Sequence, residues 1–353
     1  MDEIDDKLRA HDRPTSFDIA YRAGVSQSTV SRALRGDPNV SDDTRRRIET
    51  IARELKYKVD KNASSLRSQR SNTIAVLFFE DPSPDPSLIN PFFLAMVGSI
   101  TRACAKRRYD LLISFQNFAQ DWNEDYEDSG KADGLILLGY GDFETYRERL
   151  RKLVEQGTRF VRWGGAAQTG QPGVTVGSDN FQGGRDAASH LIALGRRRIA
   201  FLGDGSSHYP EFAERYRGYR DALTAAGLNP GSALQVDAIS SEQSGADAAR
   251  VLMARHGRFD AIVAASDLIA IGALHAVQDA GLDVPRDVSI VGYDDLPAAS
   301  LVNPPLTTVS QDTWQAGEKL VDVLLRLVHG EAVESQVLPT KLIVRRSTAA
   351  AKG

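Results

Sequence analysis

Short apolar runs of strand length, separated by stretches with helical periodicity, fill most of the chain beyond residue 72. The runs are TIAVLFF, YDLLISF, ADGLILLG, RFVRWGG, RRIAFLG, FDAIVAAS and DVSIVGYDD. Helical stretches such as GGRDAASHLIALG and FAERYRGYRDALTAAG separate them. Apolar strands that alternate with helices are typical of parallel sheets in α/β proteins. So many strands favour two lobes over one sheet, and the lack of a full GxGxxG motif after a strand disfavours a dinucleotide fold.

Length and composition narrow the class of protein. The 353 residues suffice for two or three domains, and 42% hydrophobic with 25% charged residues predicts a globular chain. No apolar run approaches the ~20 residues of a membrane span, and the acidic first residues do not resemble a signal peptide. The single cysteine, Cys104, lies in an apolar pattern and builds no disulfide framework. We therefore expect a cytoplasmic protein with Cys104 in its core and no membrane contact.

Charge is unevenly distributed along the chain. Residues 13–70 hold 13 Lys and Arg against 7 Asp and Glu, which gives this head a net charge of +6. The whole chain has a net charge of −4, so the remainder carries −10. A basic head on an acidic body indicates that the head alone meets an anionic polymer.

The basic head has the pattern of three short helices. Thr15, Ser26 and Ser41 are the expected N-caps, and Gly24 and Gly36 end the first two helices. The apolar members of these helices are Phe17, Ile19, Ala20, Ala23, Val30, Ala33, Leu34, Ile48, Ile51, Ala52 and Leu55. A tight glycine turn between the first two predicts a helix-turn-helix, although an ordinary three-helix bundle with a polar surface stays open.

The second of these helices carries short polar side chains within AGVSQSTVSRALRG, where a solvated helix would carry Glu and Lys. In a helix-turn-helix this element lies in the DNA major groove, with its N-terminal residues at base edges. Gln and Arg make paired contacts to adenine and guanine, while Ser and Thr contact bases or phosphates. The polar stretch VDKNASSLRSQRSNT that follows the head is, by itself, typical of a linker.

Two segments of the head, TSFDIAYRAGVSQSTVSRALRG and NVSDDTRRRIETIARELKY, carry a resemblance. They resemble the DNA-binding domain of the lactose-repressor (LacI/GalR) family of bacterial transcription regulators. By position, the resemblance implies base contacts from Gln27, Ser28 and Arg32. It implies phosphate contacts or capping by Ser26, Thr29 and Ser31. Arg35 departs from the family, in which many members have Asn here, and we expect it to contact a phosphate. It also implies a hinge whose Leu66 enters the minor groove and bends the duplex.

Further segments resemble this family in order along the body: NPFF, ADGLILL, SDNFQGGRDAASHLIALGRRRIAFLG, RYRGYRDAL, DVSIVGYDD, NPPLTTV and KLIVRRST. The implied fold is an all-α helix-turn-helix head plus an α/β body. That body has two Rossmann-like lobes of the periplasmic-binding-protein type I kind. The implied division is 13–59 for the head, 60–72 for the hinge and 73–353 for the body. Lobe 1 would hold about 73–177 and 313–339, and lobe 2 about 178–312 and 340–349.

The resemblance also implies an effector site between the lobes. Arg215 and Asp294 would hold the effector, with Gln311 beside them and Ser266 where the family usually has Asn. The side chains expected to line or stack on the effector are Phe92, Phe93 and Trp163. Trp122 and Trp314 are further possibilities, with Trp314 facing the cleft or a crossover. Read without the family, Arg215 is a surface charge, Asp294 a loop or capping acid, and the aromatics plain core residues.

The expected function is a homodimeric transcription regulator, a repressor that binds a double-stranded operator and responds to a mono- or disaccharide as inducer. No cofactor or metal is expected, since the six histidines form no metal-spaced cluster. No GxSxG or Walker motif is present, so an enzyme is not expected. The alternatives are a regulator with a nucleobase or other metabolite as corepressor, a solute-binding protein of sugar transport, and a sugar-modifying enzyme. The lack of a long C-terminal heptad run favours a dimer over a tetramer.

Overall fold

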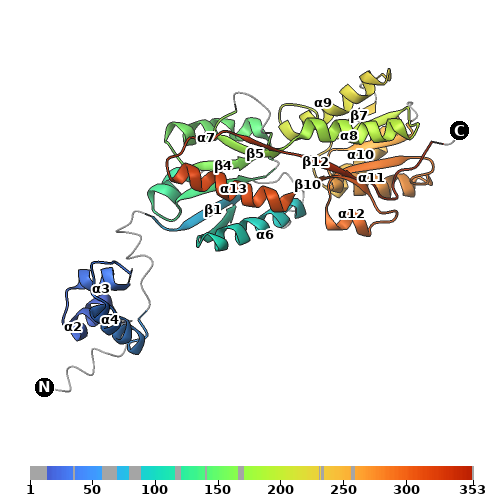
Figure 1. The fold of residues 1–353 in the computed structure, drawn as a ribbon. Helices are drawn as coiled ribbons and strands as arrows, with labels where there is room; N and C mark the ends of the chain where they lie inside the picture. Colours follow the sequence, from blue (N-terminus) through green and yellow to red (C-terminus); the bar gives the residue numbers. More distant parts are fainter. Residues whose placement is uncertain are drawn as a thin grey trace. The chain divides into compact units, whose positions relative to one another are not determined.

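The computed structural model divides the chain into two units, Met1–Ser71 and Asn72–Gly353 (Figure 1). The residues that it describes are 14–34, 36–57, 70–78, 89–115, 121–139, 141–165, 171–229, 231, 234–255 and 259–351. The expected phosphate contact of Arg35 and the expected DNA wedge of Leu66 lie outside the described residues. The same holds for most of the hinge.

The described residues of the first unit form three helices. Their bounds are α2 (Ser16–Ala23), α3 (Gln27–Leu34) and α4 (Asp42–Glu54). Each begins directly after its predicted cap: the Thr29 N–H donates to Ser26 Oγ at 3.2 Å, and Ser41 accepts from the first turn of α4. Gly24 ends α2 with a φ of 62°, a left-handed conformation that glycine adopts without steric cost. The predicted three-helix pattern is confirmed.

The core of the head joins all three helices. Its buried members are Ile19, Ala20, Ala23, Val30, Ala33, Val40, Ile48 and Ala52. Phe17 does not belong to it, because 71% of its surface is exposed, and Tyr21 one turn later is 90% exposed. Phe17 and Ile19 are two residues apart, so they point to nearly opposite sides of α2. Phe17 is therefore an apolar residue of α2 that faces solvent.

The second unit, as far as it is described, contains two six-stranded sheets. The first has the strand order β11-β5-β4-β3-β1-β2 and is parallel throughout. Its strands are β1 (Thr73–Phe78), β2 (Asp110–Phe115), β3 (Gly134–Leu138), β4 (Phe160–Trp163), β5 (Val174–Ser178) and β11 (Gln336–Leu338). We call this sheet and its covering helices lobe 1.

The second sheet has the order β12-β10-β9-β8-β6-β7, and β12 alone is antiparallel to its neighbour. Its strands are β6 (Ile199–Leu202), β7 (Gln235–Val236), β8 (Ala261–Ala264), β9 (Ser289–Asp294), β10 (Thr307–Gln311) and β12 (Thr340–Ile343). This sheet and its helices are lobe 2. In each lobe the strand that comes first along the chain lies between the second and the third. Open α/β sheets bind ligands outside the carboxyl ends of strands at such a reversal.

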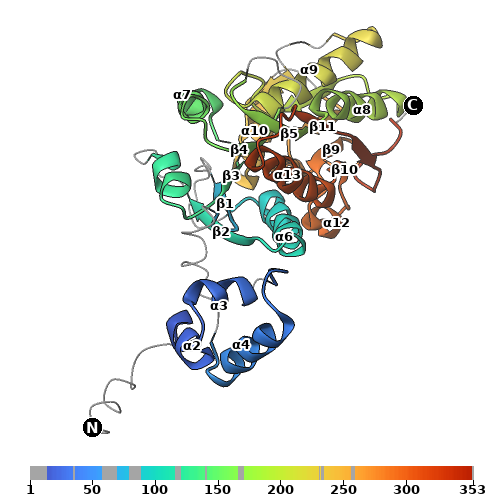
Figure 2. The ribbon, with the colours of Figure 1, turned by 60° about the vertical axis from the view of Figure 1, so that its left-hand side comes forward.

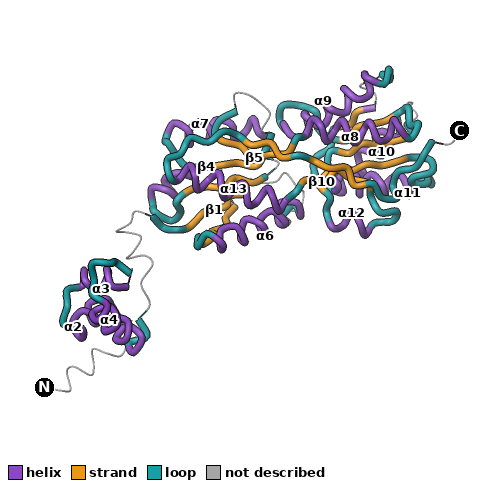
Figure 3. The backbone as a smooth tube through the Cα atoms, viewed as in Figure 1, coloured by secondary structure: helices purple, strands orange, loops and turns teal. Residues whose placement is uncertain are grey.

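Helices cover both sheets (Figure 3). In lobe 1 they are α6 (Pro91–Lys106), the π-helical turn η1 (Glu124–Asp128), α7 (Phe143–Glu155) and α13 (Thr313–Val328). In lobe 2 they are α8 (Asn180–Ala193), α9 (Pro210–Ala225), α10 (Glu242–Ala254), α11 (Asp267–Asp279) and α12 (Pro297–Leu301). Helix α13 lies beside α6, although two hundred residues separate them (Figures 1 and 2). Gly317 permits this approach, because a Cβ there would lie 2.0 Å from Ser99 Oγ.

The chain passes from lobe 1 to lobe 2 at Asp179, returns at Asp312 and crosses again at Pro339. Asp179 and Asp312 each cap the helix that follows, accepting from backbone N–H groups of the first turn at 2.9 Å. Two crossings also touch each other, since the Asp179 N–H donates to the Leu338 carbonyl at 2.8 Å. Capped helices therefore begin where two of the crossings end.

Cys104 lies within the core of lobe 1, as expected, and burial raises the pKa of its thiol to about 11. Its thiolate is thus suppressed at neutral pH, which suits a packing role. Among the helices described, none has the length and apolar character needed to cross a bilayer.

Candidate functional site: a DNA-reading helix and an effector cleft

The exposed face of α3 presents two of the three predicted base readers. Ser28 and Arg32 are both exposed and lie one helical turn apart, so they share a face. Gln27 is half-buried, and its Nε2 donates to Ser16 Oγ at 3.1 Å, which holds it against α2. The Ser26 hydroxyl lies 2.8 Å from both the Ser28 and the Thr29 hydroxyl. Ser31 is half-buried on the Gln27 side. The hydroxyl groups of these serine and threonine side chains form a polar edge beside Arg32.

One arginine of the basic run on α4 has a structural role that the sequence did not reveal. Arg45 Nη2 donates to the carbonyls of Asp37 at 2.9 Å and Val40 at 3.2 Å, and so holds the loop after α3. Arg46 and Arg47 are exposed beside it. Arg45 therefore fixes the end of the reading helix, while its two neighbours stay available to an anionic partner.

In lobe 2, Arg215 of α9 lies fully buried at the carboxyl ends of the strands. Its Nε donates to Asn180 Oδ1 at 2.8 Å, and its Nη1 donates to the Ala265 carbonyl just beyond β8. The guanidinium carbon lies 3.7 Å from the ring centroid of Tyr293. Hydrogen bonds and ring contact fix the guanidinium plane, so Arg215 is no solvated surface charge.

Asp294, at the end of β9, joins Arg215 in this polar group. Its Oδ1 lies 3.8 Å from Arg215 Nη1 and accepts from Gln311 Nε2 at 2.7 Å. Asp294 has a φ of 113° and Asp295 one of 57°, both in a region that non-glycine residues rarely occupy. Such strain is found where surrounding bonds hold a functional loop. The structure thus brings together Arg215, Asp294 and Gln311, three of the predicted effector residues.

A buried carboxyl holds this strained loop in place. Asp267 accepts from the Leu296 N–H at 2.7 Å and from the Thr308 hydroxyl at 2.6 Å. Burial raises its pKa well above the usual range, and the charge of Asp294 adds to this effect, although both hydrogen bonds oppose it. Asp267 ties the loop after β9 to β10 and α11, and sequence reasoning did not single it out.

The predicted aromatic residues gather in lobe 1. The ring of Phe92 lies with its centroid 5.3 Å from that of Phe93 and 5.9 Å from that of Trp163. All three belong to the buried core that α6 and α13 form against the sheet. They therefore contribute to packing, and Phe92 and Phe93 also lie in the first turn of α6, next to the lobe junction described below.

A chain of hydrogen bonds connects the aromatic side to Ser266. Asn90 caps α6 with its Oδ1, and its Nδ2 donates to Ser240 Oγ in lobe 2 at 3.1 Å. Ser240 Oγ donates in turn to Ser266 Oγ at 2.9 Å. Ser266 caps α11 and follows Ala265, whose carbonyl binds Arg215. The aromatic and polar groups therefore meet across the junction, and Asn90 and Ser240 are parts that the sequence did not reveal.

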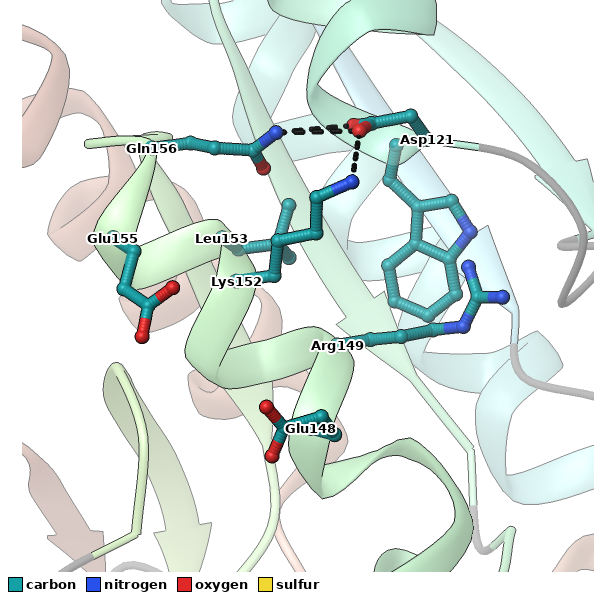
Figure 4. Close-up of a pocket in the computed structure, with 8 residues that line it drawn as sticks. Asp121, Glu148, Arg149, Lys152, Leu153, Glu155 and Gln156 are labelled. Atoms are coloured by element: carbon teal, nitrogen blue, oxygen red, sulfur yellow. Dashed lines mark hydrogen bonds and ion pairs between the residues drawn. The ribbon is translucent and has the colours of Figure 1, made fainter.

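The two other tryptophans do not belong to the core that holds Trp163. Trp122 packs with Leu135 and Leu137, on the opposite face of the first sheet from Trp163, and Trp314 is half-exposed beside Arg102. The expected place of Trp122 in the cleft is therefore wrong, whereas Trp314 lies two residues beyond the crossing at Asp312, and a crossover was one of its two expected places. Trp122 instead helps to line a surface pocket of about 560 Å³ along α7. In that pocket Lys152 and Gln156 both point at Asp121 (Figure 4).

Comparison with known proteins identifies the chain. Its residues 17–60 match the family model "Bacterial regulatory proteins, lacI family", and residues 188–348 match "Periplasmic binding protein-like domain". It is 33% identical over 340 residues to the HTH-type transcriptional regulator CelR of Thermobifida fusca, covering 95% of this chain and 98% of that protein. The chain belongs to the lacI family. This lacI-family protein is a DNA-binding transcription regulator, and its relatives are regulators, not enzymes.

Two solved structures resemble the lacI-family regulator over nearly its whole length. One is described as a transcriptional regulator CelR–cellobiose complex, at 32% identity and a TM-score of 0.70, covering 95% of this chain and all of that one. The other is a lac repressor dimer bound to operator and the anti-inducer ONPF, at 27% identity and a TM-score of 0.82, covering 96% and 100%. The predicted head-plus-two-lobe fold is confirmed. Within the described ranges, no group of acidic, histidine or cysteine side chains has a metal-binding arrangement.

Proposed function

We propose that this lacI-family regulator is a cytoplasmic homodimeric repressor, that it reads a pseudo-palindromic operator with α3, and that a sugar bound between its lobes releases the operator. The main support is the buried group Arg215–Asp294–Gln311 in lobe 2. A chain of hydrogen bonds through Asn90, Ser240 and Ser266 connects this lobe to the aromatic side of lobe 1. A guanidinium, a carboxylate and an amide suit hydroxyl groups, and aromatic faces suit the CH face of a pyranose. The solved relative whose description names cellobiose supports a sugar.

The division of labour along the chain is part of this proposal. Residues 13–59 would bind DNA, 60–72 would form the hinge, and 73–353 would bind effector and dimerise. Operator contacts are assigned to Ser26, Gln27, Ser28, Thr29, Ser31, Arg32, Arg35 and Leu66. Effector contacts are assigned to Phe92, Phe93, Trp163, Arg215, Ser266, Asp294 and Gln311. The solved lac repressor dimer on its operator supports the dimer and the DNA-binding mode.

A ligand screen on the full chain tests the proposal. A sugar that binds the folded state raises its stability by RT ln(1 + [L]/Kd), or about 2.7 kcal/mol at a hundred times Kd. We expect at least one mono- or disaccharide to raise the melting temperature of the wild-type protein, and to do so much less in Arg215→Met. An equal shift in Arg215→Met would place the sugar elsewhere, and a shift by nucleobases alone would replace the inducer proposal with a corepressor.

The effect on DNA separates an inducer from a corepressor. Linkage makes the effect of sugar on operator affinity equal to that of operator on sugar affinity, typically about 1–3 kcal/mol. Fluorescence anisotropy of a labelled operator, with and without the best sugar, measures this coupling. We expect the sugar to weaken operator binding, and tighter binding would contradict the inducer role.

A further inference from the structure

Arg162 of β4 is a buried charge that the effector group above does not use. Only 2% of its surface is exposed. Neither its Nε nor its Nη2 has a hydrogen-bond partner within the described part of the chain. A buried guanidinium without acceptors is costly, and buried charges in proteins are normally paired and hydrogen-bonded. Arg162 therefore lacks acceptors on one edge of its guanidinium group.

Glu211 lies at the other edge of this guanidinium. Arg162 Nη1 and Glu211 Oε1 lie 2.7 Å and 2.8 Å from the point that a Cβ on Gly164 would occupy. That same Oε1 accepts from the Gly165 N–H at 2.8 Å. Burial lowers the pKa of Arg162, and the neighbouring Tyr146 and Glu211 counteract this effect. Glu211 thus compensates the charge from the Nη1 side, and among the described residues the Nε–Nη2 edge has no acceptor.

The position of Arg162 is that of a ligand-binding residue in this fold. It comes near the carboxyl end of β4, where open α/β sheets bind their ligands. Gly165, just beyond, contacts Glu211 of lobe 2, so this end of β4 lies at the lobe junction. Glu211 and Arg215 are one turn apart on α9 and therefore share a face. Arg162 thus flanks the same junction as the effector group around Arg215.

The N-terminus of α9 adds a second feature that favours an anion here. This helix has 16 residues, and Tyr209 at its cap position does not cap the first turn through its side chain. Uncapped N–H groups and the helix dipole stabilise negative charge near a helix N-terminus. Glu211 occupies the first turn and partly satisfies this preference. Gly164 and Gly165 therefore lie between the Nη1 side of Arg162 and the first turn of α9, which holds Glu211.

We propose that the effector is an acidic sugar, whose anionic group accepts two hydrogen bonds from Nε and Nη2 of Arg162 while its hydroxyls reach the Arg215–Asp294 group. This inference rests on the proposed function, because it assigns the chemical class of that effector. The Nε and Nη2 hydrogens point in parallel from one edge of the guanidinium, which matches two oxygens of one carboxylate or phosphate. A neutral sugar leaves this buried edge without a charged partner.

Matched pairs of sugars test the proposal on the full wild-type chain without any substitution. D-glucuronate, D-gluconate and D-glucose 6-phosphate are each compared with D-glucose, and D-galacturonate is compared with D-galactose. All titrations are made at equal ionic strength. A charged two-point hydrogen bond predicts that the acidic member of at least one pair binds about 10- to 100-fold more tightly in calorimetric titration. Comparing the affinities of the carboxylate sugars with that of the phosphate sugar shows which of the two anionic groups the site prefers.

Substitutions then assign the preference to its side chain. Arg162→Gln is expected to remove the preference for the acidic member while changing the affinity of the neutral partner by less than about threefold. Arg162→Lys keeps the charge but loses the two-point edge, so an intermediate preference is expected. Arg147→Gln is the matched control, since Arg147 is a half-exposed arginine of α7 paired with Glu144 and its loss changes net charge equally. It should retain the full preference.

The outcomes separate this inference from the proposed function. Neutral sugars that bind as tightly as their acidic partners would overturn the acidic effector and leave the sugar-responsive repressor standing. An unchanged preference in Arg162→Gln would likewise overturn the role of Arg162. If no sugar of either kind binds at about 10 mM, or if Arg215→Met binds them all normally, the proposed function fails as well.

Discussion

The imidazole Nδ1 of His208 in lobe 2 lies 2.8 Å from Oδ1 of Asp142 in lobe 1. Beside this pair, the Phe143 N–H donates to the His208 carbonyl at 2.9 Å. The hydrogen bond to Asp142 and its charge raise the pKa of His208. Burial alone would raise the pKa of Asp142, but the hydrogen bond and charge of His208, together with the N–H groups of Glu144 and Thr145, outweigh it and lower that pKa. The lobes are therefore joined, in this arrangement, by a contact that depends on a proton.

This contact predicts a pH dependence of any ligand affinity that requires the lobes to meet. Because the pKa of His208 is raised, its contribution is complete below the usual histidine value of about 6.5 and is lost as pH rises through the raised value. Affinity measured by calorimetry from pH 6 to pH 9 should therefore fall with rising pH. His208→Gln should flatten this slope. The same slope in that variant would assign it to another group.

A second prediction concerns the buried pair of Arg215 and Asp294. Asp294→Ala leaves the Arg215 charge buried with less compensation, and breaking a buried pair costs about 3–5 kcal/mol. Denaturant unfolding should show this loss in the body. Asp294→Asn keeps one carbonyl acceptor for Gln311 and should cost less. If both variants have the free energy of unfolding of the wild type, the pair does not contribute to stability.

Operator reading by α3 gives a third prediction. Arg32 is exposed on the same face as Ser28, so Arg32→Ala should cost about 1–3 kcal/mol on the operator and relax the base preference at one position. Anisotropy titrations with operator and with random DNA measure both effects. Arg46→Ala, which removes an exposed arginine from α4, should lower both affinities alike. An equal loss on both DNAs in Arg32→Ala would mean that Arg32 touches phosphate alone.

The carboxyl that holds the strained loop gives a fourth prediction. Asp267→Ala removes the acceptor of two donors, the Leu296 N–H and the Thr308 hydroxyl. An unsatisfied buried donor costs about 1–3 kcal/mol, so the free energy of unfolding should fall by at least that amount. Thr308→Ser keeps the hydroxyl and serves as the control. A loss in Thr308→Ser as large as in Asp267→Ala would point to packing around the threonine methyl.

Local features of the fold were predictable from the sequence, and pairings between distant segments were not. Ser26 and Ser41 cap their helices through bonds to residues three positions on, so short-range spacing reveals them. The predicted apolar runs did not include β5, β7, β10, β11 and β12. Their sequences, VTVGS, QV, TTVSQ, QVL and TKLI, are very short or contain polar residues. Asn90 and Ser240 are 150 residues apart, and no periodicity relates them. Family resemblance supplied Arg215 and Asp294, whereas Arg162 emerged only from its unmatched guanidinium edge.

The three crossings between the lobes have a mechanical consequence. Rotation of one lobe against the other displaces atoms in proportion to their distance from the axis, so an axis through Asp179, Asp312 and Pro339 strains the connections least. The hydrogen bond from Asp179 to Leu338 draws two crossings together and makes that pivot narrow. For a given angle of rotation between the lobes, the atoms farthest from the crossings then move most. Substitutions at the pivot should therefore change the size of the response to a ligand while touching neither ligand nor DNA.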